Sequence, residues 1–89
     1  MSKEEKLFNA SKNGNLLTIK NLLQDQTVDP NQFLESTPLL VACLEGHLEI
    51  VKLLITDPRI DINKPNVREL TPFWISCFQG HLDIVKHLS

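Results

Sequence analysis

Apolar residues recur along the chain in short blocks at helical spacing. In one block Leu48, Val51 and Leu54 are three residues apart, which places them on one face of a helix. Glu49 and Lys52 fall between them and lie on the opposite face. The pattern therefore predicts an amphipathic helix with one buried side and one solvent side.

The blocks belong to a longer repeat. Residues 37–54 return 34 positions later as 71–88, with Thr-Pro at the start of both copies and Gly-His-Leu near the middle. A weaker copy over 7–23 aligns with the middle copy at an offset of 32 and places Gly14 under Gly46. A fixed period of this length is typical of a repeat architecture, in which each unit packs only on its neighbours.

Each copy contains signals for two short helices and a loop. Thr37 precedes Pro38, which marks a helix start because the hydroxyl can cap a free amide and proline tolerates the first helical position. Gly46 marks the end of this helix, since glycine adopts the positive φ of a C-cap. A second helix over about 48–55 follows, and residues 57–66, rich in Asp, Asn and Pro, predict an extended connection. Helices this short are marginal alone, so stability is expected to come from stacking.

These repeated residues resemble the ankyrin repeat over nearly the whole chain. The resemblance is carried by Thr-Pro-Leu at 37–39, Gly-His-Leu-Glu-Ile-Val-Lys at 46–52 with its counterpart at 80–86, and Asp-Ile-Asn at 61–63. It implies an all-α fold, an ankyrin-repeat solenoid of stacked helix-turn-helix units with extended loops between repeats. A single domain over 1–89 is expected, with repeats over about 4–35, 36–69 and 70–89, the last one incomplete.

Three departures from the family pattern change this picture. Leu40 and Trp74 stand where ankyrin repeats carry a histidine, so weaker polar contacts are expected there. Glu35 and Glu69 replace the usual glycine of the loop turn, which predicts irregular loop tips. The last copy stops inside its second helix without the polar outer face of a terminal repeat. We therefore expect a fragment of a longer array, or a chain that covers its C-terminal face in a homo-oligomer.

Composition and charge exclude several classes of partner. The 89 residues carry a net charge of −2 and no basic cluster, so the electrostatic surface of a nucleic-acid-binding protein is missing. The charged N-terminus is followed by no apolar segment of signal-peptide or membrane-spanning length. The sequence thus predicts an intracellular, cytoplasmic protein that does not insert into a membrane.

No set of residues predicts catalysis, a cofactor or a metal site. His47 and His81 stand one repeat apart without a third ligand nearby. Cys43 and Cys77 occupy equivalent helix positions, and the axes of packed helices lie about 8–10 Å apart, too far for a disulfide. Both cysteines are expected to be buried thiols. No triad, paired acid cleft or glycine-rich phosphate loop is present, so we predict a protein that is not an enzyme.

Two further expectations concern single side chains. Phe73 and Trp74 are aromatic residues at the start of an inner helix and are expected in the core. The ankyrin resemblance also implies that Asn63, and Asn31 by position, can be substrates of an asparagine hydroxylase.

The same resemblance implies a surface for a partner protein. In this family the two residues before the helix-ending glycine, together with the loop tip before Thr-Pro, line a concave recognition face. Carried over by position, the residues of this face are Leu44, Glu45, Phe78 and Gln79 from the helices and Phe33, Leu34, Val67, Arg68 and Leu70 from the loops, together with Lys12, Asn13 and Ser36. The set is unusually apolar, and exposed apolar residues in a row mark a binding site.

We therefore predict a non-catalytic scaffold or adaptor that binds another protein on this face. The alternative is a self-associating fragment, or a regulatory targeting domain cut from a larger multidomain protein or enzyme.

Overall fold

A computed structural model describes residues 2–31 and 36–89 of the chain. This part contains six α-helices and no β-strand, which confirms the all-α prediction. The helices are α1 (Lys3–Asn13), α2 (Leu16–Leu23), α3 (Pro38–Glu45), α4 (Leu48–Ile55), α5 (Pro72–Gln79) and α6 (Leu82–Leu88). None of the helices in these two stretches is both long and apolar enough to cross a membrane.

The helix ends lie where the local sequence signals place them. The hydroxyl of Thr37 accepts a hydrogen bond of 3.0 Å from the amide of Leu40, so the predicted N-cap of α3 is confirmed. Thr71 caps α5 in the same way through the amide of Trp74. At the other end of α3, Gly46 takes a φ of 78°, in the left-handed region that favours glycine. Short-range signals thus fix the length of each inner helix.

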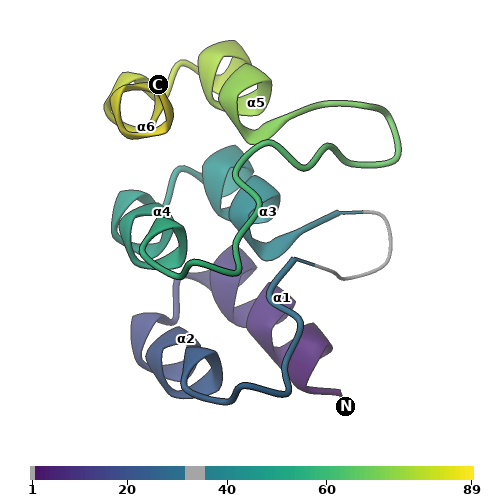
Figure 1. The fold of residues 1–89 in the computed structure, drawn as a ribbon. Coiled ribbons are helices and arrows are strands. Elements are labelled where there is room, and N and C mark those ends of the chain that lie inside the picture. The colour runs from purple at the N-terminus through teal and green to yellow at the C-terminus, as the bar shows by residue number, and fades with distance from the viewer. Residues whose placement is uncertain (1, 32–35) are drawn as a thin grey trace.

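The six helices form three antiparallel pairs stacked in one direction (Figure 1). Helices α1, α3 and α5 lie side by side in an inner layer, and α2, α4 and α6 form an outer layer. The loop that joins α4 to α5 projects from the inner layer on the side away from the outer helices. The predicted stack of helix-turn-helix units is therefore confirmed.

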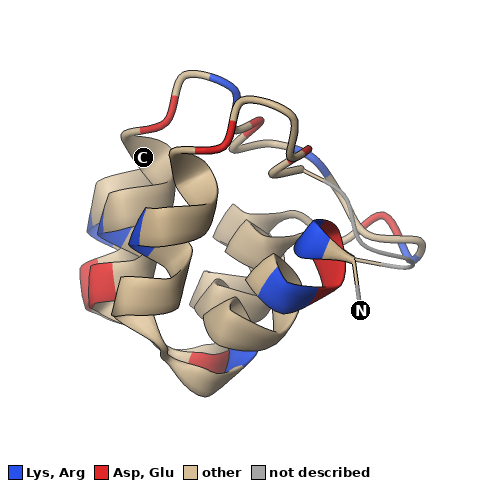
Figure 2. Cartoon of the chain, turned by 90° about the horizontal axis from the view of Figure 1, so that it is seen from below, with Lys and Arg blue, Asp and Glu red and all other residues tan. Residues whose placement is uncertain are grey.

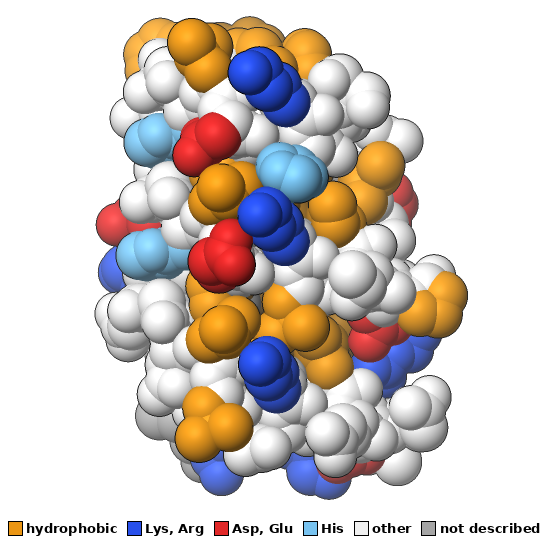
Figure 3. All heavy atoms as spheres, turned by 90° about the vertical axis from the view of Figure 1, so that its left-hand side faces the viewer, with side chains coloured by type: hydrophobic (Ala, Val, Ile, Leu, Met, Phe, Trp, Pro, Cys, Tyr) orange, Lys and Arg blue, Asp and Glu red, His pale blue; other side chains and the backbone are white. Residues whose placement is uncertain are grey.

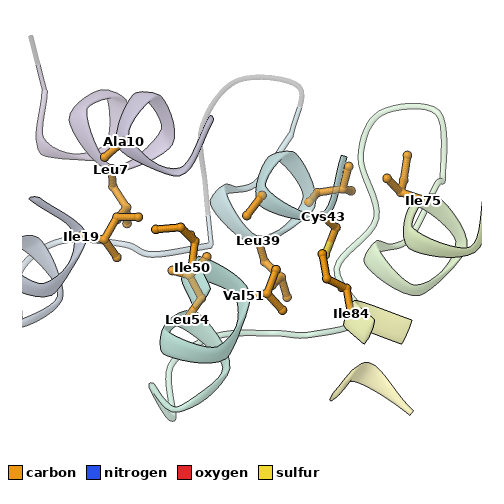
Figure 4. Packing of buried hydrophobic residues seen from close by; sticks show 12 residues of the cluster. Leu7, Ala10, Ile19, Leu39, Cys43, Ile50, Val51, Leu54, Ile75 and Ile84 are labelled. Atoms are coloured by element: carbon orange, nitrogen blue, oxygen red, sulfur yellow. The ribbon is translucent and has the colours of Figure 1, made fainter. Parts of the chain in front are cut away.

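The hydrophobic core runs along the stack from pair to pair (Figure 4). Leu7 and Ile19 lie at the first pair, Leu39 and Leu54 at the second, and Ile84 at the third, each with 0–1% of its surface exposed. Helix α1 packs on α3, and α3 packs on α5. Each pair therefore buries its apolar side chains against a neighbouring pair, as expected for helices too short to be stable alone.

Histidines of the inter-helix turns link successive pairs. The ring N–H of His47 at Nε2 donates to the carbonyl oxygen of Lys12 at 3.0 Å, and Nε2 of His81 lies 3.4 Å from the carbonyl oxygen of Leu44. The first pair carries Asn15 at the corresponding position, and this side chain caps α2 itself. The turn histidines of the second and third pairs thus each make a polar contact with the previous pair.

A second polar link joins the loops. The guanidinium of Arg59 donates to the carbonyl oxygens of Leu23, Asp25 and Val28 at 2.8–3.1 Å, all of them at the end of the first pair. Asp57 binds the same guanidinium through two oxygens, at 3.1 and 2.8 Å. The side-chain hydrogen bond from Arg59 lowers the pKa of Asp57, so the carboxylate stays charged and holds the arginine in place.

Asn31 makes the neighbouring link between loops. Its side-chain amide donates to the carbonyl oxygen of Arg59 and its side-chain oxygen accepts from the amide of Asp61, both at 2.6 Å. Asn63, the corresponding residue of the next loop, has no side-chain partner among the residues that the structure describes. The two asparagines singled out from the sequence therefore differ, because only the Asn31 amide is engaged in holding the stack together.

Candidate protein-interaction surface

The residues predicted to bind a partner lie on two parts of the inner layer. Leu44 and Glu45 form the last turn of α3, and Phe78 and Gln79 form the last turn of α5. The loop residues Val67, Arg68 and Leu70 precede α5. Phe33 and Leu34 were predicted to join them and lie outside the residues that the structure describes. These seven residues, called here the partner surface, are exposed except for the half-buried Leu70. Of the other residues predicted for this face, Lys12 and Asn13 are exposed and Ser36 is half-buried.

Hydrogen bonds shape the loop part of the partner surface. The side-chain oxygen of Asn66 accepts from the amides of Arg68 and Leu70 at 2.8 and 3.0 Å, and the backbone amide of Asn66 donates to the carbonyl oxygen of Leu70 at 3.0 Å. Glu69 takes a φ of 64°, the left-handed conformation that a glycine would adopt there. The tip expected to be irregular is thus a closed turn, and it holds Val67 with 66% of its surface exposed.

Two aromatic rings dominate the helical part of this region. Trp74 and Phe78 stack with centroids 5.0 Å apart and planes 9° from parallel, as residues one helical turn apart can. Phe78 is 72% exposed and Trp74 is 47% exposed. The expectation that Trp74 and Phe73 are core residues is wrong, since Phe73 is also 44% exposed.

The reason for this exposure is the position of α5 in the stack. Phe73 and Trp74 correspond to Leu39 and Leu40, which are 1% and 2% exposed because α5 packs over α3. No described residue packs over α5 in the same way. The equivalence of Trp74 to the buried Leu40 predicts burial, so no signal in the sequence identifies Trp74 as a surface residue.

Charged side chains are nearly absent from this part of the molecule. Helix α5 has none, and α3 has only Glu45. Figure 2 shows the charged residues on α1, the outer helices and the loops. The partner surface thus has apolar members on both helices and the loop, and its two charged members are Glu45 and Arg68.

The outer layer has a different character. Lys20, Lys52 and Lys86 occupy equivalent positions in α2, α4 and α6, and Figure 3 shows cationic side chains in a column over these helices. Glu49 lies 3.3 Å from Lys52 in an exposed ion pair, and Asp83 takes the same place beside Lys86 in the sequence. Alternating charges of this kind form a solvated face.

The candidate chemical groups do not converge on one site. Within residues 2–31 and 36–89, no three His, Cys, Asp or Glu side chains are grouped as they are around a metal ion. Burial raises the pKa of the Cys43 thiol to about 11, so this cysteine is not a nucleophile at neutral pH. The expectation that both cysteines are buried is wrong for Cys77, which is exposed on α5. Its face of α5 is the one that no described residue covers.

A comparison with known protein families agrees with this geometry. A family model for ankyrin repeats, in three copies, matches residues 7–89. No curated protein matches the chain.

Proposed function

Because the chain belongs to the ankyrin repeat family, whose repeats are generally protein–protein interaction modules, we propose that it binds a partner protein through the partner surface. The observation that carries the proposal is the exposure of apolar side chains on the inner helices and on the loop before α5. Val67 and Phe78 are about two-thirds exposed or more, and Leu44 is 39% exposed. Exposed apolar groups bordered by polar residues are typical of binding surfaces.

The shape of the partner surface supports a binding role. The Asn66 side chain fixes the loop tip before a partner arrives, and the stacked rings of Trp74 and Phe78 hold each other in place. A loop backbone and an aromatic ring that are already held in place lose less conformational entropy on binding. Aromatic side chains in such positions commonly contribute a large share of the binding energy.

We propose that the module works without catalysis. Ankyrin repeats are typically non-catalytic, and the buried Cys43 thiol with its raised pKa offers no nucleophile. We further propose a cytoplasmic location, because both cysteines are free thiols and a reducing compartment keeps them so.

The test uses a double variant that changes only the partner surface. Leu44→Glu with Val67→Glu places two carboxylates where a partner is proposed to bury apolar surface, so the affinity should fall by more than about tenfold. Leu17→Glu is the matched control, because Leu17 is 68% exposed and takes the position of Glu49 in the next repeat.

The measurement is quantitative affinity capture with each immobilised protein, followed by titration of every protein that the wild type retains. Circular dichroism of all three proteins checks that the helices are unchanged. A partner that binds the double variant as tightly as the wild type excludes the partner surface as its site. A partner that the control also loses is not bound specifically by this face.

A further inference from the structure

The turn between α1 and α2 contains a reactive pair of residues, Asn13 and Gly14. Asn13 is the only asparagine in the sequence that is followed by glycine. Asparagine in this setting can lose its side-chain nitrogen without an enzyme, because glycine lacks a Cβ and leaves its backbone nitrogen accessible. Asn13 is exposed, and its side chain has no hydrogen-bond partner among the residues that the structure describes. The side chain is therefore available for deamidation, and the backbone around it controls the rate.

The reaction closes a succinimide ring within the chain. The backbone nitrogen of Gly14 gives up its proton to water and attacks Cγ of Asn13, so a bond from this nitrogen to Cγ forms while the bond from Cγ to the side-chain nitrogen breaks. The side-chain nitrogen takes up a proton and leaves as ammonia. Water then opens the ring at either carbonyl carbon and gives aspartate or isoaspartate. One water is consumed and one ammonia is released, with no change of oxidation state.

The cap at the end of α1 holds the backbone of this pair away from the reaction. Asn13 is the last residue of α1, and the ring cannot close until the linkage to Gly14 rotates out of helical geometry. The N–H of Gly14, which must lose its proton, donates to the carbonyl oxygen of Ala10. Gly14 takes a φ of 80°, and the amide of Asn15 donates to the same oxygen at 2.9 Å. The attacking nitrogen is thus engaged in the helix cap.

A histidine from the next helix pair holds the same turn from outside. Nε2 of His47 donates to the carbonyl oxygen of Lys12 at 3.0 Å. A Cβ built at Gly14 would lie 3.2 Å from Cε1 of the His47 ring and 3.4 Å from its Nδ1. Figure 1 shows the turn between α1 and α2 beside the turn between α3 and α4 in the stack. Because His47 contacts the residues on both sides of Asn13, rotation of the reactive linkage requires the loss of these contacts.

We propose that Asn13–Gly14 is a site of spontaneous deamidation that the docked His47 restrains. The reaction then proceeds from the fraction of molecules in which the turn has opened, so its rate follows the population of that open state. The products also oppose reclosure. A carboxylate at position 13 lies at the negative end of the α1 dipole, and an isoaspartate adds a methylene to the backbone, which displaces Gly14 from the cap. Deamidation therefore makes a reversible opening between the first two pairs permanent.

The first test follows the loss of the Asn13 amide in buffer and in guanidinium chloride. Samples are incubated at mildly alkaline pH and digested, and mass spectrometry detects the exchange of amide for carboxylate in the peptide that contains Asn13. In denaturant Asn13 should react at least about tenfold faster than in buffer, because the cap and the histidine contacts are lost. Asn63 is the internal control, since it is already exposed in the folded chain and is followed by lysine. Its slow rate should change by less than about twofold.

A pair of matched variants tests the role of His47. His47→Asn removes the contact with Lys12, and His81→Asn removes the corresponding contact of the next turn with Leu44. The first pair already carries an asparagine at this turn position, where it caps its own helix, so both variants should fold, as circular dichroism can check. In buffer Asn13 should react about fivefold faster in His47→Asn, as expected for the loss of one hydrogen bond. In His81→Asn the rate should stay within about twofold of the wild type.

Three outcomes overturn the proposal. If Asn13 keeps its amide in guanidinium chloride, the pair is not reactive. If it reacts as fast in buffer as in denaturant, the fold does not restrain it. If it reacts no faster in His47→Asn than in His81→Asn, the restraint does not come from His47. The result is independent of the proposed partner surface, because neither variant changes a residue of that surface.

Discussion

Arg59→Met tests whether a single side chain joins the second loop to the first helix pair. In the wild type, Nη1 of Arg59 donates to the carbonyl oxygens of Asp25 and Val28 at 3.1 and 3.0 Å, and Nη2 donates to that of Leu23 at 2.8 Å. These residues are 31 to 36 positions away in the sequence. Methionine keeps most of the aliphatic length and removes every donor.

The expected loss follows from counting these bonds. A hydrogen bond within a protein contributes a net 0.5–1.5 kcal/mol, so the three bonds to carbonyl oxygens contribute roughly 3 kcal/mol, and the two bonds to Asp57 are lost with them. The side chain of Arg59 is 24% exposed, so water compensates part of the loss and we expect a loss of at least about 2 kcal/mol. A domain of this size has a free energy of unfolding of about 4–13 kcal/mol. The variant should therefore lose a substantial fraction of the stability.

The assay is equilibrium unfolding in urea, followed by circular dichroism. Arg68→Met is the matched control, because Arg68 is exposed and its recorded hydrogen bond uses the backbone amide. Arg59→Lys should recover little, since one ammonium cannot reach three carbonyl oxygens and a carboxylate at once. An Arg59→Met protein within about 0.5 kcal/mol of the wild type, or full recovery by lysine, would falsify the role given to the guanidinium.

Two further pairs of variants test the contacts between repeats, each by urea unfolding. Gly46→Ala and Gly80→Ala introduce the same strain at φ values of 78° and 75°, but the new methyl group lies 2.8 Å from the His81 ring only at Gly46. Gly46→Ala should therefore cost roughly 1 kcal/mol more than Gly80→Ala, and equal losses would show that the histidine does not pack there. Asn31→Ala removes two hydrogen bonds between loops and should cost about 2 kcal/mol, whereas Asn63→Ala should be nearly neutral. A similar loss for both asparagines would contradict the inter-loop link.

Local signals explain why the helices could be predicted from the sequence. A threonine followed by proline begins α3 and α5, and a glycine ends both, because each acts on the backbone within one turn. The copies recur at offsets of 32 and 34 residues, which predicts that the helix pairs stack on one another. The resemblance to the ankyrin repeat identifies the type of stack. Even Glu69, which departs from the family pattern, adopts the backbone conformation of the glycine it replaces. The loop turn is held by Asn66, whose two side-chain contacts lie within four residues.

The links between repeats could not be predicted in the same way. Arg59 and Asn31 act on backbone groups about thirty residues away, and nothing in the nearby sequence names those acceptors. The turn histidines are visible as part of the repeat, yet their acceptor is a carbonyl oxygen of the previous pair. Backbone carbonyls are present in every residue, so only the packed structure selects which one is used.

The candidate site shows a different limit of sequence patterns. Leu40 and Trp74 have the same place in their helices, and periodicity assigns both to the side that faces the next pair. Leu40 is 2% exposed and Trp74 is 47% exposed, because α5 packs over α3 and no described residue packs over the corresponding side of α5. Periodicity thus identifies the face of a repeat that is suited to packing. Whether that face belongs to the core or to an interface depends on the neighbour that covers it.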